Sequence, residues 1–145
     1  MRERLAAQNQ PYHFETTHAA GAVVSNPKEV AFMLRVRAHL ADPKMWLQNG
    51  QYWSNDFIQA VRRGLYIPIE ETPSCLIGTA LLLQGMVYGR EHSWGERVVR
   101  DSMGFTTYQE LYRWNDTCTH EQLLARLDAA IVKLQRPEEE SCTSL

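Results

Sequence analysis

The sequence predicts an all-α fold: a single compact domain of about five to six helices, packed around a central apolar helix at residues 73–88. Helix-capping patterns recur along the chain, and the apolar residues between them follow helical spacing. The run 76–87 is apolar on nearly every side, and such a helix belongs in the middle of a soluble protein's core. No β-hairpin is predicted, because Asn49-Gly50 has too few β-branched neighbours.

The chain divides into three segments. Residues 1–24 show no sustained period and predict a loosely ordered N-terminal arm. Residues 25–136 hold every predicted helix, and a chain of 145 residues is long enough for one domain with a sizeable core. Residues 137–145 begin with a proline and three glutamates, so we expect a disordered acidic tail.

The first helix has clear start and stop signals. Asn26 stands at the expected cap, Pro27 at the first helical position and Glu29 at the third. The helix should stop at Asp42-Pro43, because the residue before a proline disfavours the helical region.

Two further capping patterns precede the next helices. Ser54 or Asn55 can cap a second helix, which is expected to end at Gly64. Thr72 can cap the central helix, with a proline at its first position and Cys75 at its third. Cys75 would then lie in the first helical turn, where partial positive charge favours a thiolate.

The C-terminal half predicts three more helices. A capping box at residues 93–96 opens the first, which Gly104 ends. Residues 106–114 are predicted to form a short helix. Thr119 and the glutamine three residues later form another capping box, which places His120 in the first turn of the last helix.

Composition narrows the classes of function. A net charge of -2 and the lack of any basic run make nucleic acid an unlikely partner. The longest apolar run is too short to span a bilayer, and no signal peptide is evident, so we expect a cytoplasmic protein with no membrane partner. The three cysteines lack CxxC spacing and no phosphate-binding loop is present, so we expect no metal site and no cofactor.

DNA binding is a lesser alternative that residues 93–114 leave open. Their two predicted helices and the turn between them superficially form a helix-turn-helix. The second helix would offer Tyr108, Gln109, Glu110 and Arg113 to bases and phosphates, and a single basic residue gives this reading little support.

Four residues could form a thiol-dependent hydrolase or acyl transferase. Cys75 would be the nucleophile, His120 its base, and Asn115 or Asp116 the group that orients the imidazole. The structural alternative is equally physical: a free cysteine often packs as a small buried hydrophobe, and the polar groups can cap the last helix. We favour the structural role for these residues.

Aromatic residues of the first half suggest a protein-binding surface. Trp46, Tyr52 and Trp53 gather around a flexible connector, and Arg62 and Arg63 lie close by in the sequence. Trp, Tyr and Arg dominate interface hot spots. The same aromatic residues could instead cover the core over the central helix, since large rings in a small domain need burial.

The chain also resembles an uncharacterised family of small proteins found in actinobacteria and their bacteriophages. The resemblance covers roughly residues 28–134 and rests on five motifs: Ala41-Asp42-Pro43-Lys44-Met45-Trp46, Cys75-Leu76-Ile77-Gly78-Thr79-Ala80-Leu81, Asn115-Asp116, Thr119-His120, and Leu127-Asp128-Ala129-Ala130-Ile131. Two departures from the family pattern are a shorter space before Thr119 and an inserted Thr79. The resemblance implies a fold and a bacterial or phage setting, and it implies no activity.

From these observations we expect a small helical protein that acts by binding another protein. This expectation rests on elimination, because the sequence holds no phosphate loop, no metal-ligand spacing, no basic field and no paired carboxylates. The thiol enzyme is the main alternative.

Overall fold

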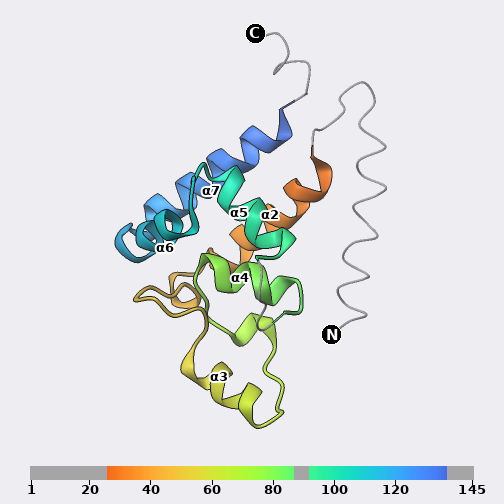
Figure 1. Cartoon of the computed structure of the whole chain (residues 1–145), viewed down its shortest axis with the longest axis vertical. Helices are drawn as coiled ribbons and strands as arrows, with labels where there is room; N and C mark the ends of the chain where they lie inside the picture. Colours follow the sequence, from red (N-terminus) through yellow and green to blue (C-terminus); the bar gives the residue numbers. More distant parts are fainter. Residues whose placement is uncertain (1–25, 87–91, 137–145) are drawn as a thin grey trace.

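The computed structural model describes residues 26–86 and 92–136, and within these ranges it contains six α-helices, two short 3-10 helices and no strand (Figure 1). The predicted all-α fold is therefore confirmed. The α-helices are α2 (Pro27–Leu40), α3 (Asn55–Arg62), α4 (Leu76–Leu83), α5 (Trp94–Ser102), α6 (Tyr108–Thr117) and α7 (His120–Gln135); the 3-10 helices are η1 (Pro43–Met45) and η2 (Ile69–Glu71). None of the described helices has the length and apolar character needed to cross a membrane. The predicted arm and tail lie outside the described residues.

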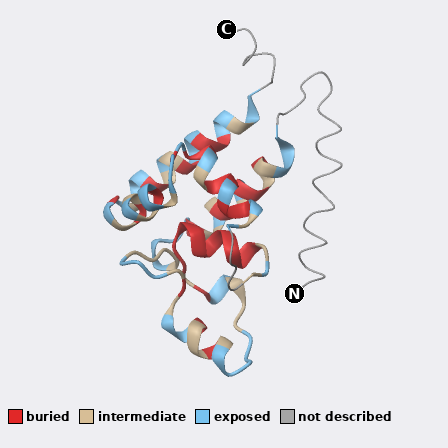
Figure 2. Cartoon of the chain, in the orientation of Figure 1, coloured by how far each residue is buried: buried red, intermediate tan, exposed pale blue. Residues whose placement is uncertain are grey.

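Helix α4 is the central helix that the sequence predicts. All eight of its residues are buried, and Figure 2 shows them as an uninterrupted red segment in the middle of the domain. Helix α2 packs against α4, α5 and α7. Helix α3 lies at one end of the domain, away from α2 and α7 (Figure 1).

The boundaries of this central helix differ from the prediction. It spans residues 76–83 and begins three residues later than predicted, because Cys75 itself is the N-cap and Thr72 lies in extended backbone before it. At the other end, Gly85 adopts a φ of +72°, a left-handed conformation that ends the helix.

Most of the capping predictions are confirmed. The Ser54 side chain accepts from the backbone of Phe57, and the predicted boxes at Ser93 and Thr119 both form, as does one at Thr107. Two caps differ from the prediction. Cys75 takes the place of Thr72 at the start of α4, and the Asn26 side chain makes no capping bond because its backbone is left-handed, with a φ of +56°.

Helix α6 extends further than the sequence predicts. It continues to Thr117 and so includes Asn115 and Asp116, which lie beyond the helix predicted at residues 106–114. Two residues, Cys118 and Thr119, separate it from α7. The break occurs where the Thr119 capping box opens the next helix, so the Asn-Asp pair stays helical.

The connector, residues 46–54 between η1 and α3, crosses the N-terminal end of α4. Asn49 and Gly50 both have positive φ, which makes a tight turn of the Asn-Gly type. The flanking residues pair with the segment before α4 and not with each other: Ser74 forms isolated bridges with Trp46 and with Trp53. The turn therefore forms without a hairpin.

Candidate functional site

Asn115 holds the N-terminal end of α4 in place. Its Oδ1 accepts hydrogen bonds from the Leu76 backbone N–H at 3.1 Å and from Trp46 Nε1 at 3.0 Å. Its Nδ2 donates to the Leu47 carbonyl at 3.0 Å and to Asp116 Oδ1 at 3.1 Å. This buried amide uses both its acceptor and its donor groups, and it joins α6, the connector and α4.

Cys75 occupies the N-cap position of α4 with its thiol turned into the protein. The residue is 6% exposed, and its Sγ accepts from the Gly78 backbone N–H at 3.3 Å. Burial raises the pKa of the Cys75 thiol to about 11, and the backbone hydrogen bonds only partly oppose this effect. The thiol is therefore neutral near pH 7, the opposite of the activated thiolate that a nucleophile requires.

His120 is directed to another neighbour. Its Nε2 lies 2.7 Å from the carbonyl oxygen of Leu40 at the end of α2, and its ring packs beside Trp46 at 5.7 Å between centroids. No hydrogen bond joins His120 to Cys75 among the described residues. The structure thus brings Cys75, Asn115 and Asp116 to one pocket, while His120 is not among the residues that line it. This geometry gives the thiol-enzyme hypothesis no support.

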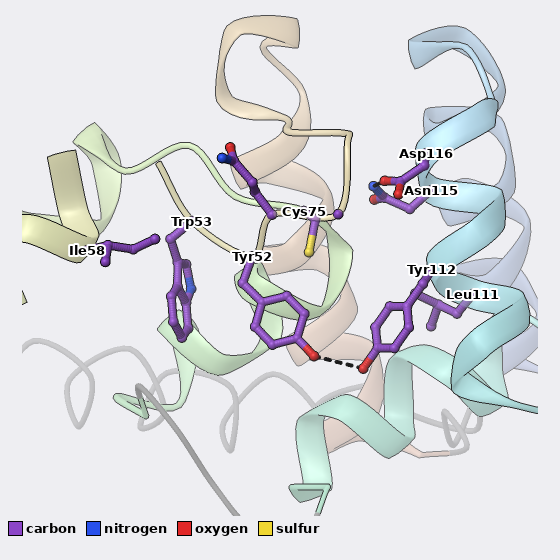
Figure 3. Close-up of a pocket in the computed structure, with 10 residues that line it drawn as sticks. Tyr52, Trp53, Ile58, Cys75, Leu111, Tyr112, Asn115 and Asp116 are labelled. Atoms are coloured by element: carbon purple, nitrogen blue, oxygen red, sulfur yellow. Dashed lines mark hydrogen bonds between the residues drawn. The ribbon is translucent and has the colours of Figure 1, made fainter. Parts of the chain in front are cut away.

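A pocket of about 510 Å³ opens between the connector, Cys75 and α6 (Figure 3). Its lining residues come from these three segments and from α3: Gly50, Gln51, Tyr52, Trp53, Ile58, Cys75, Leu111, Tyr112, Asn115 and Asp116. The hydroxyls of Tyr52 and Tyr112 meet at 2.9 Å across the pocket. Burial and this hydrogen bond raise the pKa of Tyr112, so its phenol stays neutral.

The predicted aromatic surface is largely part of the core. Trp53 is only 1% exposed, and its Nε1 donates to the carbonyl of Gly78 at 3.0 Å, so placing it in a surface patch was wrong. Trp46 and Tyr52 are half-buried. Arg62 and Arg63, at the end of α3, are exposed as a binding role requires.

A second hollow lies beside α3, where large apolar side chains are exposed. Leu65 is 62% exposed and Tyr66 is 56% exposed. Both line an apolar groove of about 300 Å³ between α3, its following segment and the end of α4. The other lining residues are Phe57, Val61, Gly64, Ile67, Ile69, Leu82, Gly85 and Met86.

Sequence reasoning missed a buried polar cluster around His39. Thr79 Oγ1 donates to the Cys75 carbonyl at 2.7 Å, so the hydroxyl of Ser74, 2.7 Å away, must donate to Thr79. His39 Nε2 then donates toward the Thr72 carbonyl at 3.0 Å and the Ser74 Oγ at 3.2 Å. Ser74 is fully buried, so this cluster fixes the segment before α4 and exposes no nucleophile.

This cluster predicts a loss of stability in mild acid. Burial lowers the pKa of His39, although the Thr72 carbonyl and Glu70 act against that effect. The unfolded chain therefore binds a proton more readily than the folded protein does, and stability falls as the pH drops from about 6.5 through the lower folded-state pKa. Urea denaturation between pH 8 and pH 5 measures this slope. His39→Gln should reduce it, and a slope as steep in this variant as in wild type would contradict the assignment.

Helices α5 and α6 form the predicted helix–turn–helix segment, but its second helix offers little to DNA. Glu110 accepts from the backbone of Thr106 and Thr107 in the capping box. Arg113 is exposed and is the only basic residue of α6. The Tyr108 ring stacks on His92, with 3.5 Å between their centroids. DNA binding remains a prediction that the geometry does not strengthen.

Comparisons of the chain with family models, with curated proteins and with solved structures gave no match.

Proposed function

We propose that the protein acts in the cytoplasm by binding another protein through the apolar groove beside α3. The observation that carries this proposal is the exposure of Leu65 and Tyr66 at the rim of that groove. An exposed large apolar side chain is common singly, but two exposed neighbours beside an apolar groove form a contiguous surface of the kind that partners cover. The bacterial or phage setting of this binding rests on the sequence resemblance alone.

The charge around the groove favours a particular partner. Arg62 and Arg63 lie three and two residues before Leu65 and are exposed, and the structure gives neither an ion pair among the described residues. Arginine at an interface can form bidentate bonds to carboxylates. The proposed partner therefore presents an amphipathic segment, with one large apolar side chain for the groove and acidic residues beside it.

A peptide-display selection against the folded protein tests this proposal. Peptides that combine a large apolar residue with flanking Asp or Glu should be enriched. Leu65→Glu should weaken their binding about tenfold or more, which corresponds to about 1.4 kcal/mol. Because Leu65 is mostly exposed, this variant should keep the fold, which a thermal melt followed by circular dichroism can check.

A matched control comes from the opposite end of the domain. Val132 on α7 is 53% exposed, so Val132→Glu makes the same kind of change on another surface and should leave peptide binding unaltered. Reversing the charge of Arg62 and Arg63 should weaken acidic peptides more than neutral ones. A selection without enrichment, or enriched peptides that bind Leu65→Glu as tightly as wild type, would refute the proposal.

A further inference from the structure

The pocket beside Cys75 is separate from the α3 groove and has its own aromatic lining. Its walls are aromatic, with Tyr52 and Trp53 on the connector and Tyr112 on α6 (Figure 3). A volume of about 510 Å³ lies within the range typical of small-molecule sites. The faces of Tyr and Trp rings carry partial negative charge, which attracts cations.

One charged side chain lies among the residues that line this pocket. Asp116 is half-buried, and its Oδ1 accepts from Asn115 Nδ2 at 3.1 Å. No arginine or lysine forms an ion pair with it in the described parts of the chain. Burial is the main cause of the raised pKa of the Cys75 thiol, and the nearby negative charge of Asp116 adds a smaller effect in the same direction.

The other polar groups of the pocket add no compensating positive charge. The thiol of Cys75 and the phenol of Tyr112 are neutral near pH 7, as their raised pKa values require. The side-chain amide of Asn115 is fully engaged in hydrogen bonds within the protein, so it does not contribute to ligand binding. An uncompensated carboxylate at the edge of an aromatic hollow favours a positively charged ligand.

We propose that this pocket binds an organic cation, namely a protonated amine or guanidinium group carried on an apolar or aromatic body. The cationic group would lie against Asp116, and the apolar body would lie against the half-buried rings of Tyr52 and Tyr112. The same chemistry is offered by a free arylalkylamine and by a lysine or arginine side chain of a polypeptide. This site is separate from the α3 groove, so either proposal can fail without the other.

Calorimetric titration with three related probes tests the charge preference. The 2-phenylethylammonium ion should bind in a saturable manner, whereas neutral 2-phenylethanol and anionic phenylacetate should bind about tenfold more weakly or not at all. Asp116→Asn should remove the preference for the cation, because the new amide oxygen can still accept from Asn115 while the charge is lost. Glu71→Gln, an exposed change in η2 outside the pocket, should leave the titration unchanged.

A second variant and a second set of probes complete the test. Gln51 lines the pocket and is exposed, so Gln51→Lys places a competing ammonium near its mouth and should weaken the cation about tenfold. If phenylethylammonium binds more tightly than the N-acetyl amides of lysine and arginine, the ligand is a free amine. If the amides bind more tightly, the ligand is a lysine or arginine side chain of a polypeptide. The absence of saturable cation binding to wild type, or equal binding to Asp116→Asn, would overturn the proposal.

Discussion

Asn115→Ala should be among the most destabilising single substitutions in this protein, with a loss of about 3–5 kcal/mol in the free energy of unfolding. The change leaves the Leu76 N–H, Trp46 Nε1 and the Leu47 carbonyl without their partner. The Leu76 N–H is buried at the start of α4, where an unpaired donor carries its full desolvation cost. Urea denaturation followed by circular dichroism at 222 nm measures the loss.

Two neighbouring variants separate this explanation from a general effect of mutating α6. Asn115→Asp keeps an acceptor for Leu76 but loses the donor to Leu47 and places a second carboxylate beside Asp116, so it should also destabilise. Asp116→Asn keeps the acceptor for Asn115 and should cost less than about 1 kcal/mol. A loss below about 1 kcal/mol for Asn115→Ala would show that this amide does not hold the α4 terminus.

Gly78→Ala should also destabilise strongly, by about 3 kcal/mol or more. Alanine normally stabilises a helix interior relative to glycine by about 1 kcal/mol, so the expected sign is the reverse of the usual one. A Cβ at position 78 would overlap the backbone carbonyl of Tyr52, where the connector crosses α4. The connector cannot withdraw easily, because Tyr52 O accepts from the Cys75 N–H at 3.0 Å and Trp53 donates to the Gly78 carbonyl.

Gly95→Ala is the matched comparison for this prediction. A Cβ there would meet the ends of the Gln84 and Phe32 side chains, and a shift of these ends would cost Gln84 its hydrogen bonds, whereas at position 78 the Tyr52 backbone itself would have to move. Chemical denaturation should therefore show a clearly smaller loss for Gly95→Ala. Equal losses, or a gain in stability for Gly78→Ala, would contradict the close approach of the connector to α4.

The elements that sequence patterns predicted well are those specified by residues near one another. Capping boxes act over three residues, and those at Ser93 and Thr119 open helices where expected. The central position of α4 follows from the composition of the helix itself, because no polar face is available to water.

The features that the sequence did not predict depend on contacts between distant segments. Asn115 lies 39 residues from Leu76 and 69 from Trp46, and no local pattern distinguishes it from an asparagine that caps a helix. Cys75 replaced Thr72 as the N-cap because Thr72 and Ser74 are held by the polar cluster around His39, which requires the folded α2. Trp53 is buried because the connector folds over α4.

Alkylation of Cys75 in the folded protein tests most directly that the α4 terminus is a closed structural junction. Wild-type protein is treated with iodoacetamide at pH 7.5, with and without urea, and the extent of labelling at Cys75 is followed by peptide mass spectrometry. A pKa of about 11 for this thiol lowers its thiolate fraction about 100-fold relative to an ordinary cysteine, and burial slows the reaction further. Cys75 should therefore label at least about 100-fold faster once urea unfolds the chain. Labelling of the folded protein at nearly the unfolded rate would contradict a closed junction at the α4 terminus.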